Sequence, residues 1–371
     1  MYRANLSKHL CGLFIFICVI CLFPVFSLAA EGATFADLAG TWNSNAFATG
    51  PDAPWWERMT ITVATDGTFT FSGTESNGNV DSGSGDFSIS SEGIVLTLPS
   101  SDSDITPPLC QINSHHTVLV CTETRSDSST NLIILTKQAA SCSLAHLAGT
   151  WEGNYLVSGP TFGWDRVTWT VKPDGKYTGS LTRSDGSSGR LSGTLSISSD
   201  GVITCVAGSC LDPDFESFMD ADKSVMVGTS AAAPTGQDVL LRVFTKKGAS
   251  YSMADLAGTW QVHSLASGPG APWWERMTTT VSPNGKFTSS GTTNSGGVDN
   301  GSGTFSISPG GVISLVTKGK HGTRYHTVVG VMDATKKVFV GTSTWVGNTD
   351  PGTADLFIGT KSTSTPARRQ E

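Results

Sequence analysis

The chain has 371 residues, a formal net charge of −7, and charged side chains at only 15% of its positions. A mildly acidic chain without a basic stripe is a poor candidate for binding nucleic acid or anionic lipid. Its length suggests two or three domains.

The N-terminus has the features of a secretory signal peptide. Arg3 and Lys8 precede an apolar run over residues 10–26, and Ser27 and Ala29 supply small residues for a cleavage site. An uncleaved anchor is the alternative, because the run approaches the length that spans a bilayer. Since no other stretch is apolar enough to span, we predict an exported protein of bacterial type, secreted, periplasmic or on the cell surface, with residues 1–30 removed.

Five cysteines lie beyond this segment, in a compartment that permits disulfides. Cys205 and Cys210 are close enough in sequence to bridge a turn. Cys110 can pair with Cys121 or with Cys142, which leaves one odd thiol. Without a pair of Cys-x-x-Cys motifs a zinc site is not expected, and we predict neither a metal nor a cofactor.

Three tandem copies of one unit make up the exported chain. The motif Leu-Ala-Gly-Thr-Trp ends at Trp42, Trp151 and Trp260, so each copy begins 109 residues after the one before. A unit of this length can be a domain by itself, unlike the short units of solenoids. We predict domains at 31–139, 140–248 and 249–362, followed by a polar tail at 363–371.

Strand patterns dominate each copy. Alternating apolar and β-branched residues flank Asp66-Gly67, Asp174-Gly175 and Asn284-Gly285, which are typical of type I′ hairpin turns. About eight strands with short connections follow a brief helical pattern. Eight sequential antiparallel strands close most simply as an up-and-down barrel, which removes exposed edges. We therefore predict an all-β chain of three such barrels; a six-bladed propeller and β-sandwiches are the alternatives.

A short helical turn that leads into Gly-x-Trp, followed by a meander of about eight strands, resembles the calycin superfamily of lipocalins, fatty-acid-binding proteins and avidins. The residues that carry the resemblance are Gly40-Thr41-Trp42 and their equivalents at Trp151 and Trp260. The resemblance implies that each Trp closes one barrel end beneath a basic residue of the last strand. Arg242 is the candidate in the second copy, whereas the other copies offer only Lys137 and Lys361.

One segment carries Trp, an acid and Arg in every copy. Counting back from the apolar positions Met59, Ile61 and Val63 places the acid on the inward face of its strand and the Trp and Arg outward. The segments are Trp56-Glu57-Arg58, Trp164-Asp165-Arg166 and Trp274-Glu275-Arg276.

Two interpretations fit these segments. In the structural one, the outward Trp and Arg stack by cation–π contact and the acid caps backbone groups. In the functional one, the segments surround a barrel mouth that binds a small apolar or aromatic ligand or a glycan, with the acid as the orienting group. The additional Trp55 and Trp273, which have no counterpart Trp in the second copy, are then further ligand-binding candidates.

Enzyme signatures are weak. Runs around Asp81 and Asp299 are similar to the aspartic-protease motif, but three copies do not match its two lobes, and a Gly-rich turn is the simpler interpretation. We predict no catalytic residues and a multivalent binding protein whose partner is a small molecule, a glycan or a protein surface. The alternatives are a scaffold with filled barrels and, remotely, an aspartic-type hydrolase.

Overall fold

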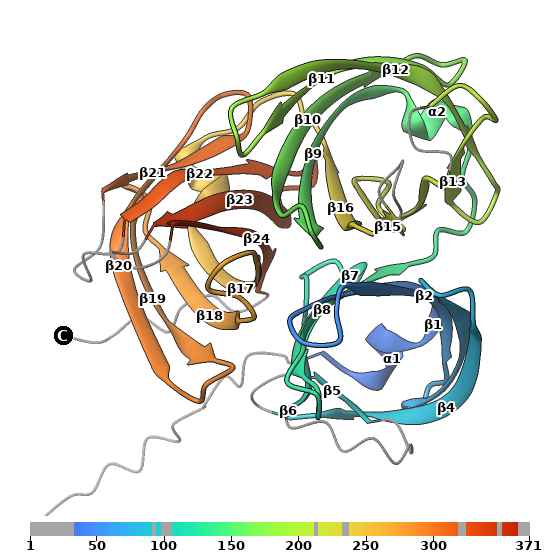
Figure 1. The fold of residues 1–371 in the computed structure, drawn as a ribbon, viewed down its shortest axis with the longest axis horizontal. Coiled ribbons are helices and arrows are strands. Elements are labelled where there is room, and N and C mark those ends of the chain that lie inside the picture. Colours follow the sequence, from blue (N-terminus) through green and yellow to red (C-terminus); the bar gives the residue numbers. More distant parts are fainter. Residues whose placement is uncertain are drawn as a thin grey trace, which may run out of the picture.

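The computed structural model describes residues 33–90, 94–97, 106–210, 214–231, 237–317, 324–346 and 351–362. These residues form three closed antiparallel barrels of eight strands, one from each copy (Figure 1). Because the strand ladders close within each copy, the predicted barrels are confirmed, and the propeller and sandwich alternatives are wrong. The predicted signal peptide and the polar tail lie outside the described residues.

The barrels share one element order. Barrel 1 contains α1 (Phe35–Leu38), β1 (Gly40–Thr49), β2 (Trp55–Val63), β3 (Thr68–Glu75), β4 (Val80–Ile89), β5 (Ile94–Thr97), β6 (Thr106–Ile112), β7 (Val118–Thr124) and β8 (Thr130–Lys137). Barrel 2 contains α2 (Leu144–Leu147), β9 (Gly149–Ser158), β10 (Gly163–Val171), β11 (Lys176–Arg183), β12 (Ser188–Ile197), β13 (Val202–Cys205), β14 (Glu216–Met219), β15 (Val225–Ala231) and β16 (Val239–Lys246). Barrel 3 contains α3 (Met253–Leu256), β17 (Gly258–Ser267), β18 (Trp274–Val281), β19 (Lys286–Thr293), β20 (Val298–Ile307), β21 (Val312–Thr317), β22 (Arg324–Met332), β23 (Val338–Val346) and β24 (Pro351–Lys361).

The hairpins at the Asp-Gly and Asn-Gly sequences differ from the predicted type I′ turns. The amide of Gly67 donates to the carbonyl of Ala64, and the amide of Ala64 donates to the carbonyl of Thr68. Gly67 has a positive φ of 92°, whereas Asp66 does not. This is a three-residue loop with glycine at the left-handed position. Asp66 instead accepts a hydrogen bond from the amide of Thr68, which stabilises the same turn from its side chain.

One end of every barrel is closed in the same way. The indole Nε1 of Trp42 donates to the carbonyl of Leu38 at the end of α1, at 2.7 Å. The ammonium group of Lys137 lies 5.4 Å from the centre of that ring and donates to the carbonyl of Asp37. The same contacts recur in barrels 2 and 3, where Lys246 lies over Trp151 and Lys361 over Trp260.

The three barrels pack around a common apolar core, which lies outside the barrel interiors. Outward-facing residues of the first, second, seventh and eighth strands of each barrel form a single buried cluster. Each barrel also has its own interior cluster. Figure 1 shows the barrels arranged side by side around the centre of the molecule. The chain therefore has the packing of a closed trimer, fused into one polypeptide.

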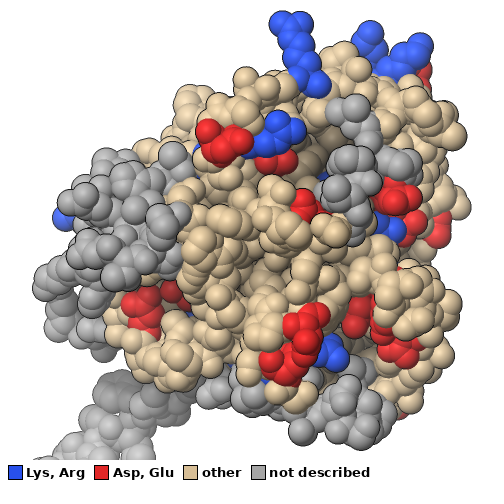
Figure 2. Space-filling view, viewed as in Figure 1, with Lys and Arg blue, Asp and Glu red and all other residues tan. Residues whose placement is uncertain are grey.

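The described residues contain two disulfides and a free cysteine. Disulfides join Cys110 to Cys121 and Cys205 to Cys210, and Cys142 is a free thiol. On the face seen in Figure 2, described charges of both signs are scattered among uncharged residues. Within the described ranges, no helix has the length and apolar character needed to cross a bilayer.

Candidate functional site

The acids of the Trp-acid-Arg segments face the barrel interiors. Strand register pairs Asp165 with Tyr155 and Glu275 with Ser264, and directly paired residues share a face of the sheet. Asp165 and Glu275 both line interior cavities. The structure therefore has the carboxylates on the inward side that strand alternation predicts. Glu57 occupies the equivalent position of barrel 1, opposite Glu75 of β3.

The Arg side chains of these segments reach the next barrel along a cycle. Arg166 of barrel 2 donates from Nε to the hydroxyl of Thr342 and from Nη2 to its carbonyl in barrel 3, both at 2.8 Å. The equivalent contacts join Arg276 to Thr122 of barrel 1, and Arg58 to Thr229 of barrel 2. The Arg–Thr contacts thus run from barrel 1 to barrel 2, from barrel 2 to barrel 3, and from barrel 3 back to barrel 1.

The Trp side chains stack beneath these guanidinium groups, at 4.0 to 4.4 Å from ring centre to Cζ. Two of the three indoles also donate to a threonine of the next barrel, at 2.8 Å: Trp164 to Thr344 and Trp274 to Thr124. Trp164 and Trp274 are 5% and 2% exposed, and Trp56 packs against the same shared core. The stacking that the structural interpretation predicts is therefore present. The same tryptophans and arginines also form contacts between barrels, which the sequence analysis did not predict.

The two additional tryptophans are less buried. Trp55 is half-buried, and the Arg125 guanidinium lies 5.1 Å from its ring centre. Trp273 is also half-buried. The loops that precede them meet between the barrels, where a cavity of about 410 Å³ is bordered by Pro54, Phe162 and Ala271. A ligand-binding role for Trp55 and Trp273 stays a prediction.

Side chains of the described part of barrel 1 pack across its interior. Phe69, Phe71 and Phe87 pack in its interior together with the Cys110–Cys121 disulfide. A Cβ on Gly83 would lie 2.8 Å from the Phe71 ring, so the glycine leaves the space that this ring occupies. Gly83 belongs to strand β4, which corrects the expectation of a Gly-rich turn around Asp81.

Barrel 2 encloses a cavity of about 600 Å³ with an aromatic lining. Gly179 occupies the position of Phe71, and the Trp169 ring lies against it: a Cβ on Gly179 would be 2.7 Å from Trp169 Cδ1. Trp169 lies 4.7 Å from Tyr177 and 5.7 Å from Phe215, ring centre to ring centre. Charged groups of both signs also line this cavity: Asp165, Arg183, Asp185, Asp238 and Arg242.

Barrel 3 encloses a cavity of about 220 Å³. Its inner part is apolar and includes Phe287 and Phe305, whose stacked rings lie 4.2 Å apart. The charged groups among its described lining residues are three carboxylates, Glu275, Asp299 and Asp355, with no Lys, Arg or His. The cavity therefore combines an apolar surface with three acids and no cationic side chain among its described lining residues.

Burial perturbs these acids strongly. Burial, together with the charges of the neighbouring Asp299 and Asp355, raises the pKa of Glu275 to about 7. Burial raises the pKa of Asp355 to about 6, against the hydrogen bond from Ser343 and the charge of Arg166, which lower it. In barrel 2, burial raises the pKa of Asp165 to about 6, although Arg183 and Arg242 lower it.

Arg242 does not have the role that the resemblance implies. Lys246 lies over Trp151, while the Arg242 guanidinium lies inside barrel 2, 5.5 Å from the Tyr155 ring and 5.4 Å from the Phe215 ring. The prediction was wrong because Arg242 lies four residues before Lys246 on β16 (246 − 242 = 4), whereas the Lys that ends each last strand reaches the closed end in all three barrels.

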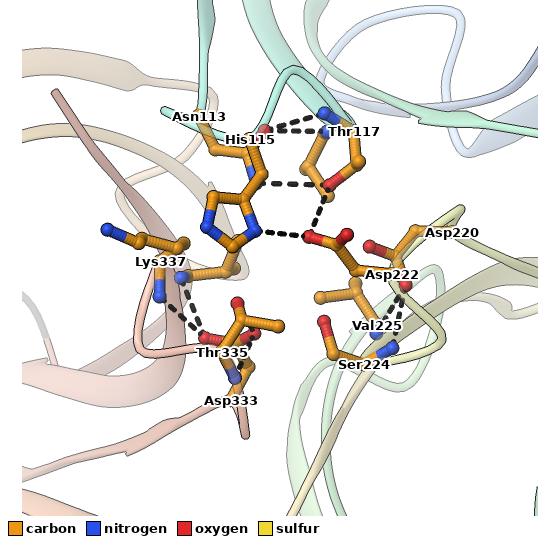
Figure 3. Close-up of polar contacts among 12 residues, drawn as sticks. Asn113, His115, Thr117, Asp220, Asp222, Ser224, Val225, Asp333, Thr335 and Lys337 are labelled. Atoms are coloured by element: carbon orange, nitrogen blue, oxygen red, sulfur yellow. Dashed lines mark hydrogen bonds and ion pairs between the residues drawn. The ribbon is translucent and has the colours of Figure 1, made fainter. Parts of the chain in front are cut away.

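A second polar cluster joins the turns between the sixth and seventh strands of the barrels (Figure 3). His115 Nδ1 of barrel 1 lies 2.6 Å from the Asp222 carboxylate of barrel 2. Asp220 accepts hydrogen bonds from the amides of Ser224 and Val225, and burial raises its pKa to about 7. These contacts order the turns and tie two barrels together.

The described residues contain no group of three or more His, Cys, Asp or Glu that could hold a metal ion. Asp81 and Asp299, the acids of the protease-like runs, lie on β4 and β20 of different barrels.

Sequence reasoning missed several lining residues. Asp355 and Trp169 were not identified as cavity residues, nor were Arg183 and Phe215. Asp355 carries a detectable signal: alternation along β24 puts it two residues before the inward Phe357, at a position that is Leu240 in the second copy. Phe215 carries none, because it lies just before β14, a strand of only four residues.

No protein-family model matches the chain, and comparison with curated proteins also gives no match. Among solved structures it is similar to a protein of unknown function from the DUF3598 family of Nostoc punctiforme, at 8% identity over 88% of this chain and 97% of that one, with a TM-score of 0.21. A mutant Transferrin Binding Protein B from Haemophilus parasuis matches at 9% identity over 87% and 76%, with a TM-score of 0.30. Kievitone hydratase from Nectria haematococca matches at 10% identity over 92% and 94%, with a TM-score of 0.25. These scores are too low to carry an argument about function.

Proposed function

We propose that this chain is an exported, non-catalytic binding protein in which barrels 2 and 3 each take a small, mainly apolar ligand into the interior. The observation that carries the proposal is the pair of cavities, of about 600 and 220 Å³, lined by aromatic and aliphatic side chains with a few polar groups. Binding sites for small molecules have this composition. The interiors remain available because the contacts between barrels use the outer faces.

The repeated closed end supports a calycin-like interpretation of each barrel. A helical turn leads into Gly-x-Trp, and a basic residue of the last strand lies over the indole in all three copies. Export is supported by the N-terminal sequence and by the two disulfides, which persist in oxidising compartments. The protein is then secreted, periplasmic or held at the cell surface.

A scaffolding role is the second candidate, and the filled interior of barrel 1 favours it for that barrel. The different linings of barrels 2 and 3 also mean that the chain presents unlike sites. We therefore expect the chain to bind different ligands at its different sites, and not to gain avidity for a single ligand.

Titration of the full exported chain with phenethyl alcohol, octanol and cellobiose tests the proposal by calorimetry and ligand-observed NMR. We expect the two apolar alcohols to bind, because even a cavity of about 150 Å³ can hold benzene. Ser289→Phe fills barrel 3 with the residue that barrel 1 has at the same position, and Leu191→Trp adds a larger ring at a residue that lines the cavity of barrel 2. Each variant should remove its own site. No binding of any compound would support the scaffold, and binding of cellobiose alone would support a glycan site.

A further inference from the structure

Barrel 3 differs from barrel 2 in how its inward acid is compensated. In barrel 2, the Arg183 Nε lies 3.9 Å from the Asp165 carboxylate, and Arg242 also lowers the pKa of this acid. At the positions equivalent to Arg183 and Arg242, barrel 3 has Thr293 and Phe357. The acid of barrel 3 has thus lost both cationic neighbours that its counterpart retains.

Barrel 3 has gained acids as well. Asp355 replaces Leu240, and Asp299 replaces Gly189. Strand register places Asp355 opposite Ala266 on β17, and Glu275 lies opposite Ser264, so the two acids flank the same strand on the interior face. Asp299 lies opposite Gly291 on the adjoining wall.

These acids are only partly satisfied within the protein. Asp355 is 5% exposed and accepts a hydrogen bond from the Ser343 hydroxyl. Arg166 acts on Asp355 from outside the barrel wall, through its contact with the outward Thr342. Glu275 is half-buried and lines the cavity, and it has no hydrogen bond or ion pair with any described residue. Burying an ionised carboxylate without a partner is costly, and a cation in the cavity would remove that cost.

We propose that the cavity of barrel 3 binds a small organic ammonium ion, with its charged group between Glu275, Asp299 and Asp355 and its apolar part on Phe287 and Phe305. This inference rests on the proposed function and adds the ligand class. The ammonium group has three donors for the carboxylates and the Ser264 and Ser343 hydroxyls. The cavity is smaller than those that take drug-sized ligands, which limits the apolar part to a ring or a short chain.

Binding is coupled to proton release. At neutral pH Glu275 holds a proton for part of the time, and the incoming cation favours its ionised form. The proton leaves to solvent as the ammonium ion enters. A neutral ligand of the same shape produces no such release.

Calorimetry of the full exported chain with three compounds of similar shape tests the proposal: phenethylammonium, phenethyl alcohol and hydrocinnamate. We expect the ammonium ion to bind at least tenfold more tightly than the alcohol, with hydrocinnamate weakest. Its apparent enthalpy should change between buffers of different ionisation enthalpy, as proton release requires. Glu275→Gln should weaken ammonium binding about tenfold or more and leave alcohol binding unchanged. Asp174→Asn, an exposed turn acid whose counterpart in barrel 3 is Asn284, is the matched control and should change neither.

The failures are distinguishable. If the alcohol and the ammonium ion bind barrel 3 equally, and Ser289→Phe removes both, the cation site is overturned while the proposed function stands. If Glu275→Gln leaves the preference for the ammonium ion over the alcohol intact, the proposed cation site is overturned, because the ammonium ion then binds at another place. If none of the compounds binds, the proposed function fails and this inference fails with it.

Discussion

The missing hydrogen bond of Trp56 allows a precise test of the contacts between barrels. Trp164 and Trp274 each donate to a threonine of the next barrel, Thr344 and Thr124. The residue at the same position facing Trp56 is Ala231, and the Trp56 Nε1 is buried without a partner. A Thr at this position, Ala231→Thr, would give Trp56 the acceptor that its two counterparts have.

The expected gain follows from the cost of an unsatisfied buried donor, about 1–3 kcal/mol, and from the net value of a hydrogen bond, about 1 kcal/mol. We expect Ala231→Thr to stabilise the chain by about 1 kcal/mol. Since the barrels share a core and should unfold together, this corresponds to about 1–2 °C in the melting temperature of a chain of this length. The reverse change, Thr344→Val, should cost about 1–2 kcal/mol.

Calorimetric and urea-induced unfolding measure these changes. Ala231→Val is the matched control, because valine has the same branched shape and strand preference but no hydroxyl. Combining Ala231→Thr with Trp56→Phe completes a double-mutant cycle. The reasoning is refuted if threonine and valine stabilise equally, or if the threonine still stabilises the chain when Trp56 is absent.

Three further predictions concern other parts of the molecule. Asp220→Asn should remove a pH dependence of the free energy of unfolding. Burial raises the pKa of Asp220 to about 7, from about 4 in the unfolded chain. The favourable contribution of this acid to stability is therefore complete below pH 4 and is lost as the pH rises through 7. The free energy of unfolding of the variant, measured from pH 4 to 8, should therefore fall less than that of the parent. Barrel 1 already has an asparagine, Asn113, at the position equivalent to Asp220. Lys246→Met should lower stability by about 1–3 kcal/mol in urea unfolding, since Lys246 donates to the His146 carbonyl and lies over Trp151; an unchanged midpoint would contradict this. Phenethylammonium binding in barrel 3 should strengthen from pH 5 to 8 as Glu275 ionises, and Glu275→Gln should flatten that profile.

The sequence predicts the barrels because three signals agree. The internal repeat gives the unit, strand alternation gives the inward face, and the Gly-x-Trp motif gives the start of each barrel. Alternation around Met59, Ile61 and Val63 also orients the acids correctly, because side-chain direction along a strand depends only on position. The predicted turn type was wrong at Asp66-Gly67, because this dipeptide suits both a two-residue type I′ turn and a three-residue loop with glycine at its left-handed position.

The roles of the outward Trp and Arg could not be derived from the pattern. Alternation says that Trp164 and Arg166 point away from their own barrel, but it cannot say that Thr342 of another barrel lies there. Cavity volume is likewise beyond a strand pattern, because it depends on which side chain fills a shared space. Phe71, Gly179 and Ser289 occupy one position in the three barrels. Only the packed structure shows that the Phe71 ring lies over Gly83 in barrel 1, whereas the Trp169 ring lies against Gly179 in barrel 2.

The three barrels differ most where a ligand would lie and least where the barrels touch. The outward Trp and Arg recur in every copy, and so does the threonine that receives each Arg, because a closed cycle requires the same contact three times. The inward position at the middle of the last strand is instead Ile133, Arg242 or Phe357. Inward substitutions leave the cycle intact, so each interior can acquire its own charge and volume independently. That separation is the physical basis for expecting one filled barrel and two unlike binding sites within a single fold.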